Sequence, residues 1–318
     1  MGRVSETRRI RPRRRRPLRV AVGFLVLIAV IGYFAVQRDS NGGAGAPYCS
    51  ASVGGDGGQK YEMTPEQAAN AATIAAVGIS KGLPDRAVTI ALATAMQESA
   101  LRNLDHGDRD SLGLFQQRPS QGWGTPEQIT DPVYSAAIFY DHLVDVPGYS
   151  RLPLTVAAQK VQRSGYPQAY AKHEPDATVL TAAFGEGGVL FCSGPAPLRG
   201  DPQKIEAELV RAFGKQTLGA AGSAPEGRTE AGAVPEPEVN LRLKRDGGPE
   251  EARRGRAMAH WAVARSHELG IARVSYGDAG WVGGQARGQW QHKGGSGKSG
   301  EADPHDAVPD EVRIFVAR

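Results

Sequence analysis

Apolar and polar residues follow helical spacing through most of residues 61–193. The first helix has clear boundary signals, because Thr64 is a good N-cap, Pro65 suits the first helical position and Gln67 completes a capping box. The second helix is apolar around most of its surface, so we expect it at the domain centre. The pattern shows no convincing strand here and predicts an all-α domain with helices at 65–80, 86–101, 126–145, 153–164 and 175–185.

The pattern changes after residue 193. Residues 201–216 could form one amphipathic helix, but 217–237 are largely Ala, Gly, Pro and Glu, and we assign 194–237 as a linker. Residues 238–318 then predict a small α/β domain. Its elements are a helix closed by a glycine at position 270 and strands at 239–244, 271–276 and 311–317.

The N-terminal region contains a long apolar segment. Residues 20–36 carry no charge and would span roughly 25 Å as a helix, near the lower limit for crossing a membrane. Residues 1–19 before them hold nine Arg, which keeps such a tail in the cytoplasm. The sequence therefore predicts a single-pass signal anchor at the cell membrane, with the C-terminal domains extracytoplasmic on a flexible stalk at 37–60.

A cleaved signal peptide is the alternative for the same segment. The A-x-A-like site at Ala44-Gly45-Ala46 is followed directly by Pro47, which disfavours cleavage there. Both interpretations export the rest of the chain.

Charge and cysteine content narrow the class of protein. The chain has a net charge of +4, but residues 1–19 alone carry +8, so the body is mildly acidic and does not predict a nucleic-acid groove. Cys49 and Cys192 are the two cysteines. In an exported protein such a pair favours a disulfide, and two unpaired buried thiols are the alternative.

The candidate chemistry lies in residues 93–132. Glu98 is near the end of the apolar second helix, where desolvation would raise its pKa and let it act as a general acid. A polar loop follows with Asp105, Asp108 and Asp110, and then the string Gly113-Leu114-Phe115-Gln116-Gln117.

This stretch resembles the superfamily of soluble lytic transglycosylases and goose-type lysozymes, in an actinobacterial membrane-anchored form. The matching residues are Glu98-Ser99 and Gly113-Leu114-Phe115-Gln116, in the places of a catalytic E-S and a G-L-M-Q-type turn. The resemblance covers 61–193. It implies a mainly α fold, with a lysozyme-like all-α domain after a single transmembrane helix and a small α/β C-terminal domain.

The resemblance also implies cleavage of peptidoglycan glycan strands between N-acetylmuramic acid and N-acetylglucosamine. Glu98 would serve as acid and base in a transglycosylase, whereas Asp105, Asp108 or Asp110 could supply a second acid in a hydrolase. The family's third motif, A-Y-N, is not legible, and the nearest polar candidates are Gln159, Gln162 and Tyr170. We expect the substrate to contact Ser99, Gly113, Leu114, Phe115, Gln116, Gln117, Trp123, Gln162 and Tyr170.

Other classes remain open. Glu98 could be a surface acid or a relic in a catalytically inactive peptidoglycan-binding or envelope-scaffold protein. A transporter fits poorly, since one membrane segment cannot enclose a pathway by itself. The C-terminal domain resembles a wall-protein module related to zinc D-Ala peptidases, but the matching Asp and His are missing. No ligand pair with metal-site spacing occurs among His260, His267, His292 and His305, so we expect no metal and no cofactor.

Overall fold

Helices and two antiparallel sheets make up the part of the chain that the computed structural model describes, which is residues 46–54, 57–166, 168–215, 237–242, 249–285, 289–292 and 311–318. Within 46–318 the buried apolar side chains form one continuous cluster. In the described ranges no helix has both the length and the apolar character needed to cross a membrane. The predicted cytoplasmic tail and the anchor at 20–36 lie outside those ranges.

The first sheet joins the two ends of the segment predicted to be all-α. It consists of β1 (Tyr48–Val53), β2 (Gln59–Met63) and β3 (Gly188–Ser193) in the order β2-β1-β3, with both pairs antiparallel. Cys49 and Cys192 lie opposite each other in β1 and β3 and are disulfide-bonded, as the cysteine count predicted.

The prediction of a mainly α fold with an all-α domain is therefore wrong. The spacing of apolar residues did not reveal this sheet, because its strands are short and bounded by glycines. In addition, β1 pairs with a strand about 140 residues away in sequence. Residues 48–53 and 59–60, predicted as part of a flexible stalk, belong to these strands.

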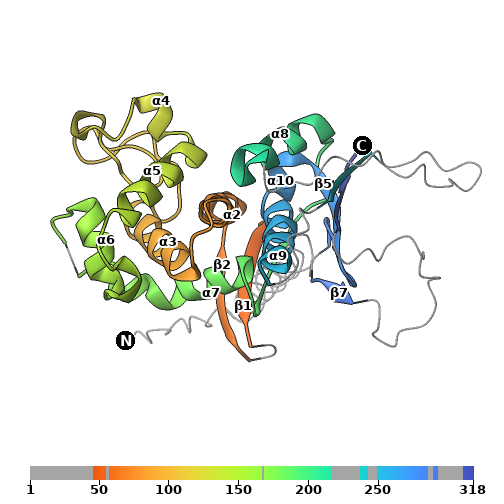
Figure 1. The fold of residues 1–318 in the computed structure, drawn as a ribbon. Helices are drawn as coiled ribbons and strands as arrows, with labels where there is room; N and C mark the ends of the chain where they lie inside the picture. The colour runs from red at the N-terminus through yellow and green to blue at the C-terminus, as the bar shows by residue number, and fades with distance from the viewer. Residues whose placement is uncertain are drawn as a thin grey trace, which may run out of the picture. The chain divides into compact units, whose positions relative to one another are not determined.

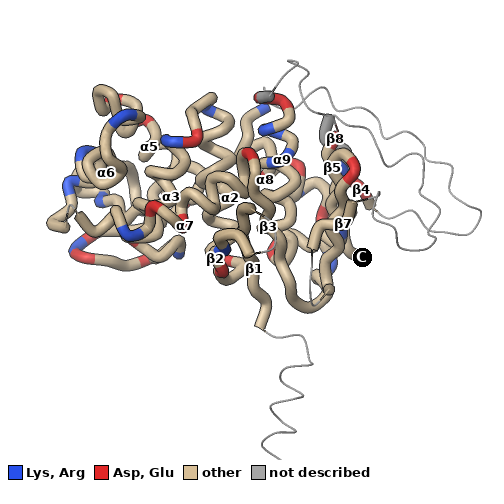
Figure 2. Tube along the Cα trace, turned by 90° about the horizontal axis from the view of Figure 1, so that it is seen from below, with Lys and Arg blue, Asp and Glu red and all other residues tan. Residues whose placement is uncertain are grey.

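The helices that carry the candidate site are α2 (Pro65–Ser80), α3 (Asp85–Ser99), α5 (Pro132–Val144), α6 (Leu154–Gln162) and α7 (Glu174–Phe184). The capping box at the start of α2 is present as predicted. In Figure 2 the tube of α2 is almost free of charged positions, and α2 packs against α3, α5 and α7. Its small apolar residues are buried, and α3 beside it is buried along most of its length, as the apolar surface of the second helix predicted.

The predicted helix at 126–145 is two helices. The short α4 (Pro126–Ile129) has Thr130 as its C-cap, and α5 begins at Pro132. Asp131 is the N-cap of α5, because its side chain accepts a hydrogen bond from the Val133 amide at 3.0 Å. A proline preceded by a capping residue starts a new helix, and this signal outweighs the continuous apolar spacing.

The second sheet contains the strands predicted near the C-terminus and two more. Its order is β4-β8-β5-β6-β7, all antiparallel, formed by β4 (Glu238–Arg242), β5 (Ile271–Tyr276), β6 (Ala279–Val282), β7 (Gln291–His292) and β8 (Glu311–Val316). The predicted helix 249–270 occurs as α9 (Pro249–Ala264) and α10 (Ser266–Leu269), closed by the left-handed Gly270.

Helix α9 connects the two sheets. It contacts β3 of the first sheet, β5 and β8 of the second, and α2 and α7 (Figure 1). Arg253 of α9 is buried and bonds Asp85 at the start of α3 at 2.6 Å, while Arg256 reaches Glu186 after α7 at 3.0 Å. Helix α8 (Pro202–Phe213) packs beside it, with Phe213 edge-on to Trp261. These ion pairs therefore connect α9 to the start of α3 and to the segment that follows α7.

Candidate active site

Glu98 occupies the last turn of α3, a helix whose other residues are mostly buried. The helix stops because Ala100 adopts a left-handed conformation, with φ of 52°. Glu98 itself is only partly exposed. Burial is the main cause that raises the pKa of its carboxyl above the ordinary 4.5. The negative end of the helix dipole acts in the same direction. The protonated form needed in a general acid is therefore retained to higher pH here than in an exposed glutamate.

Tyr170 is the direct partner of this carboxyl group. Its hydroxyl donates a hydrogen bond to Oε1 of Glu98 at 2.6 Å, and its ring is fully buried. Burial and the neighbouring carboxylate raise the pKa of Tyr170 well above its ordinary value, so the hydroxyl keeps its proton. This donor, with help from Gln162, stabilises the ionised form of Glu98 and partly offsets the effect of burial on its pKa.

The glycine-containing loop predicted to line the cleft is held against the end of α3. The buried Ser99 hydroxyl lies 2.8 Å from the carbonyl oxygen of Leu114 and 3.1 Å from that of Ala95. From the other side, the Gln162 amide donates to the carbonyl oxygen of Phe115 at 2.7 Å. Both contacts use main-chain carbonyl groups, so they fix the path of the loop beside Glu98.

The conformation of this loop requires a glycine at position 113. Gly113 has φ of +74°, and a Cβ atom added there would collide with the carbonyl oxygen of Ile129. Two residues on, the buried ring of Phe115 stacks on Phe139 of α5, with centroids 4.6 Å apart. The loop is anchored by its backbone and by one aromatic side chain.

A polar groove opens beside the loop. Its volume is about 560 Å³, and it is bounded by residues from the loop, the end of α5 and the end of α6. The lining comprises Gln116, Gln117, Arg118, Gln121, Gly122, Trp123, His142, Asp145, Val146, Pro147, Lys160, Val161, Gln162 and Arg163. A groove of this volume can hold part of an extended polar ligand.

Two glutamines of the groove have amide oxygens without a partner. Gln117 is 2% exposed and donates to the carbonyl oxygen of Ser135 at 3.1 Å, but its Oε1 accepts no hydrogen bond from the described residues. The same holds for Oε1 of Gln162. A buried acceptor is costly when unpaired, but neither oxygen has significant accessible surface, so both lie beneath the surface of the groove rather than at it.

Trp123 lines the groove next to His142, another residue of the lining. Its ring lies against His142 of α5, with centroids 4.4 Å apart, and the Tyr134 hydroxyl donates to its carbonyl oxygen at 3.3 Å. Trp123 is partly exposed, which leaves apolar ring surface at the groove. An indole in this position can stack on a sugar ring.

The three loop acids have partners of their own. Asp105 is exposed and contacts the His106 ring at 2.7 Å, and Asp108 is exposed beside Arg109. Asp110 accepts from the Ser120 amide and bonds Arg118 at 2.9 Å. Interactions with Ser120 and then Arg118 hold the pKa of Asp110 well below its usual range. These contacts favour the ionised form of Asp110, and none of the contacts of the three acids leads to Glu98.

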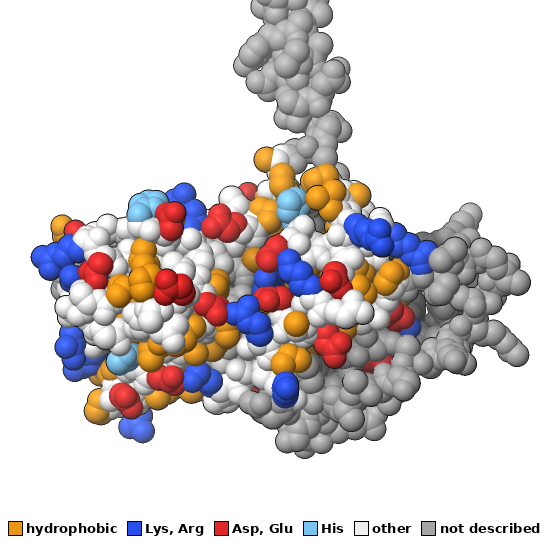
Figure 3. Space-filling view, turned by 90° about the horizontal axis from the view of Figure 1, so that it is seen from above, with side chains coloured by type: hydrophobic (Ala, Val, Ile, Leu, Met, Phe, Trp, Pro, Cys, Tyr) orange, Lys and Arg blue, Asp and Glu red, His pale blue; other side chains and the backbone are white. Residues whose placement is uncertain are grey.

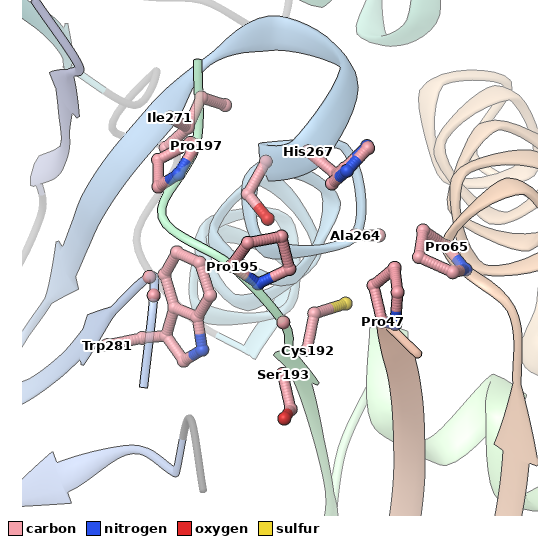
Figure 4. Close-up of a pocket in the computed structure, with 14 residues that line it drawn as sticks. Pro47, Pro65, Cys192, Ser193, Pro195, Pro197, Ala264, His267, Ile271 and Trp281 are labelled. Carbon is pink, nitrogen blue, oxygen red and sulfur yellow. The ribbon is translucent and has the colours of Figure 1, made fainter. Parts of the chain in front are cut away.

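A second cavity lies between β3, α10 and the second sheet (Figure 4). Its volume is about 20 Å³, room for one water molecule. The lining side chains in Figure 4 include Pro47, Pro65, Pro195, Pro197 and Trp281. A cavity this small is a packing feature between the two sheets, and the polar groove is the better candidate for a substrate.

The described ranges contain no group of three or more His, Cys, Asp or Glu side chains that could hold a metal ion. His260 is a buried packing residue of α9. Its Nδ1 bonds the carbonyl oxygen of Ala183, and burial lowers its pKa to about 4. His305 lies outside the described residues.

The structure brings together most of the residues that the sequence singled out. Ser99 contacts the loop 113–117, Tyr170 bonds Glu98, and Gln116, Gln117, Trp123 and Gln162 line the groove. Glu98 and Tyr170 are not among the residues that line the groove. Leu114 and Phe115 are fully buried and contribute backbone rather than side chains. Sequence reasoning missed the cations that line the groove, although Lys160 and Arg163 flank the predicted Gln162.

No protein-family model matches this chain, and no curated protein matches it significantly.

Proposed function

We propose that this protein is a glycosidase that cleaves peptidoglycan glycan strands, with Glu98 as general acid and base. The observation that carries the proposal is the environment of Glu98. Its carboxyl has a raised pKa, is hydrogen-bonded to Tyr170 and interacts with Gln162, a residue that lines the groove. A titratable group perturbed by burial beside a polar groove is the usual signature of acid–base catalysis.

The groove supports a carbohydrate substrate. Sugars offer hydroxyl and acetamido groups, which can bond polar side chains of the lining such as Gln116 and Gln121. They also present apolar ring faces, which suit the indole of Trp123. Acidic and basic side chains are interspersed over the face seen in Figure 3, a surface unlike the continuous basic stripe of a nucleic-acid binder.

The reaction would proceed in two proton transfers through one residue. Protonated Glu98 gives its proton to the glycosidic oxygen as the bond from that oxygen to C1 of the muramyl sugar breaks. The resulting carboxylate, held by the Tyr170 hydroxyl, then removes the proton of the sugar's own 6-hydroxyl while that oxygen bonds to C1. No water is consumed, Glu98 regains its proton, and the product is a 1,6-anhydro sugar.

The positions of the loop acids favour this anhydro product over hydrolysis. A hydrolase of the usual kind needs a second carboxylate to activate or position water. Asp105 and Asp108 are exposed, and the negative charge of Asp110 is compensated by its ion pair with Arg118. We accordingly propose a lytic transglycosylase rather than a muramidase.

We further propose that the enzyme works at the outer face of the cell membrane, anchored by residues 20–36. The support is the sequence alone: an uncharged apolar segment preceded by nine Arg. The glycan strands of the wall would be its partners, within reach of an anchored protein.

The test is a digestion of purified peptidoglycan by the full-length chain, with the soluble products analysed by mass. We expect muropeptides lighter by one water than the products of hydrolysis. Water-added products would contradict the transglycosylase mechanism and return attention to the loop aspartates. Absence of products, with the protein retained on the insoluble wall, would favour a non-catalytic binding or scaffold protein.

A further inference from the structure

The wall of the groove formed by α6 carries two cations with no counter-ion. Lys160 lies in the last turn of α6, and Arg163 follows it as the C-cap. Both side chains are exposed, both line the groove, and neither forms an ion pair with any described residue. They flank Gln162, whose amide holds the loop next to Glu98.

A third cation of the groove is used differently. Arg118 bonds Asp110 at 2.9 Å, so its charge is already compensated by a neighbouring carboxylate. Asp145 is the acidic side chain in the groove lining. The lining is therefore cationic on balance, and its uncompensated positive charge lies on the α6 side.

This charge fits one chemical feature of the proposed substrate. The hydroxyl and acetamido groups of a glycan are neutral, so they give no reason for cations at the groove. The negative groups of a peptidoglycan strand are carboxylates carried by the muramyl sugars. They are either free lactyl carboxylates or the carboxylates of attached peptides. Lysine and arginine bind carboxylates by charge-assisted hydrogen bonds.

We infer that Lys160 and Arg163 bind a carboxylate attached to the glycan strand and make the groove selective for anionic glycan over neutral glycan of the same length. The inference rests on the proposed function, because it assumes that the groove holds the glycan. It concerns which glycan is bound and is independent of whether Glu98 performs the chemistry.

The test measures binding rather than cleavage. The full-length chain carrying Glu98→Gln would be titrated with three soluble ligands of equal sugar number. They are a neutral N-acetylglucosamine oligomer, the alternating muramyl oligomer with free lactyl carboxylates, and the same oligomer with attached peptides. We expect at least one anionic ligand to bind about tenfold more tightly than the neutral one, and the difference to shrink at high salt.

The decisive comparison adds Lys160→Ala and Arg163→Ala together. We expect this pair to abolish the preference for anionic ligands and to leave the affinity for the neutral oligomer unchanged. Arg151→Ala with Lys204→Ala is the matched control, because it removes the same two charges from exposed positions outside the groove. The control should keep the preference. Whichever anionic ligand loses affinity in the first pair identifies the carboxylate.

Two results would overturn the inference. The first is equal affinity for neutral and anionic ligands, and the second is a preference that survives in the Lys160 and Arg163 variant. Either result would show that these cations do not select the substrate. The proposed function would remain intact in both cases, because the glycan would still bind. Failure of all three ligands to bind would overturn both proposals.

Discussion

The hydroxyl of Tyr170 donates a hydrogen bond to Oε1 of Glu98 at 2.6 Å, joining two residues that are 72 positions apart in the chain. Two opposing effects therefore act on the pKa of the Glu98 carboxyl group. Burial favours its neutral form, and the tyrosine favours its ionised form. A residue that must release a proton and then take one up needs both its protonated and its ionised form to be accessible at the working pH.

Replacing Tyr170 with phenylalanine removes the hydrogen bond and keeps the ring. Because the hydroxyl lowers the pKa of Glu98, its loss should raise that pKa further and shift the alkaline limb of the pH profile of kcat/KM to higher pH. The maximum rate should fall about tenfold to a hundredfold, the cost of losing a hydrogen bond to a charged group. Tyr134→Phe, which removes a hydroxyl bonded to the Trp123 carbonyl, is the control. An unmoved alkaline limb in Tyr170→Phe would argue against the contact as the tuning interaction.

The raised pKa of Glu98 also predicts a pH dependence of stability. The folded protein holds this proton more tightly than the unfolded chain, so the free energy of unfolding falls as pH rises above the ordinary value of 4.5 through the raised folded value. Glu98→Gln should therefore be more stable than the parent at about pH 8, with the advantage vanishing near pH 4. Melting temperatures at the two pH values test this, with the exposed Glu62→Gln as a charge control. An advantage that grew toward acid pH would contradict the assigned direction.

The loop glycine offers a stability test with a closely matched control. Gly113 and Gly148 have similar positive φ values of 74° and 68°, but only at Gly113 would a Cβ atom meet neighbouring atoms, the Ile129 carbonyl among them. Gly113→Ala should cost about 1–3 kcal/mol more than Gly148→Ala in denaturant unfolding, because it adds a clash to the same strain. It should also slow cleavage, since the loop borders Glu98. Equal costs would mean that the loop relaxes freely.

The disulfide between Cys49 and Cys192 should contribute strongly to stability. It closes a loop with a sequence separation of 143 and joins β1 to β3. Reduction should lower the free energy of unfolding by about 2–5 kcal/mol, measured from the denaturation midpoint with and without a reductant. The Cys49→Ser and Cys192→Ser double variant should show the lower midpoint under both conditions. A parent midpoint insensitive to reduction would contradict this role.

The loop aspartates separate the two candidate reactions. Asp105→Asn and Asp108→Asn should leave the cleavage rate within about twofold of the parent, because both side chains are exposed and contact neither Glu98 nor the groove lining. Rates of fragment release from purified peptidoglycan give the answer. A loss of several orders of magnitude in either variant would identify a second catalytic carboxylate and a hydrolase.

Local signals in the sequence located the helices well. Thr64 and Gln67 form the predicted capping box, and Gly270 ends the C-terminal helical segment. Both signals depend on residues within one turn of the boundary, so they can be read from the chain directly. The break before α5 was missed, although Asp131 followed by Pro132 carried the information.

The sheets were harder to predict because their pairing is not local. Strands β1 and β3 are short, and their register is set by contacts between residues about 140 positions apart. No period-2 apolar pattern marks them, since small residues such as Ser50 and Ala51 occupy the buried positions. The cysteines were the only sequence signal that linked these two strands.

The candidate site was predictable in its parts more than in its arrangement. Glu98 and the loop 113–117 were found through a resemblance, and Tyr170 was one of three polar candidates for an illegible motif. That Tyr170 rather than Gln159 meets the carboxyl follows from the turn between α6 and α7, which no spacing rule fixes. No sequence pattern marked Lys160 and Arg163 as functional residues, and only the fold shows that they line the groove together with Gln162.

The most direct test of the central claim compares the parent with Glu98→Gln on purified peptidoglycan. The substitution keeps the shape of the side chain and an oxygen for the Tyr170 hydroxyl, but it removes the proton that the reaction transfers. We predict that the release of soluble fragments falls by a factor of about 10² to 10⁴, while the variant is retained on the wall as the parent is. Release at the parental rate would contradict the assignment of Glu98 as the catalytic acid and base.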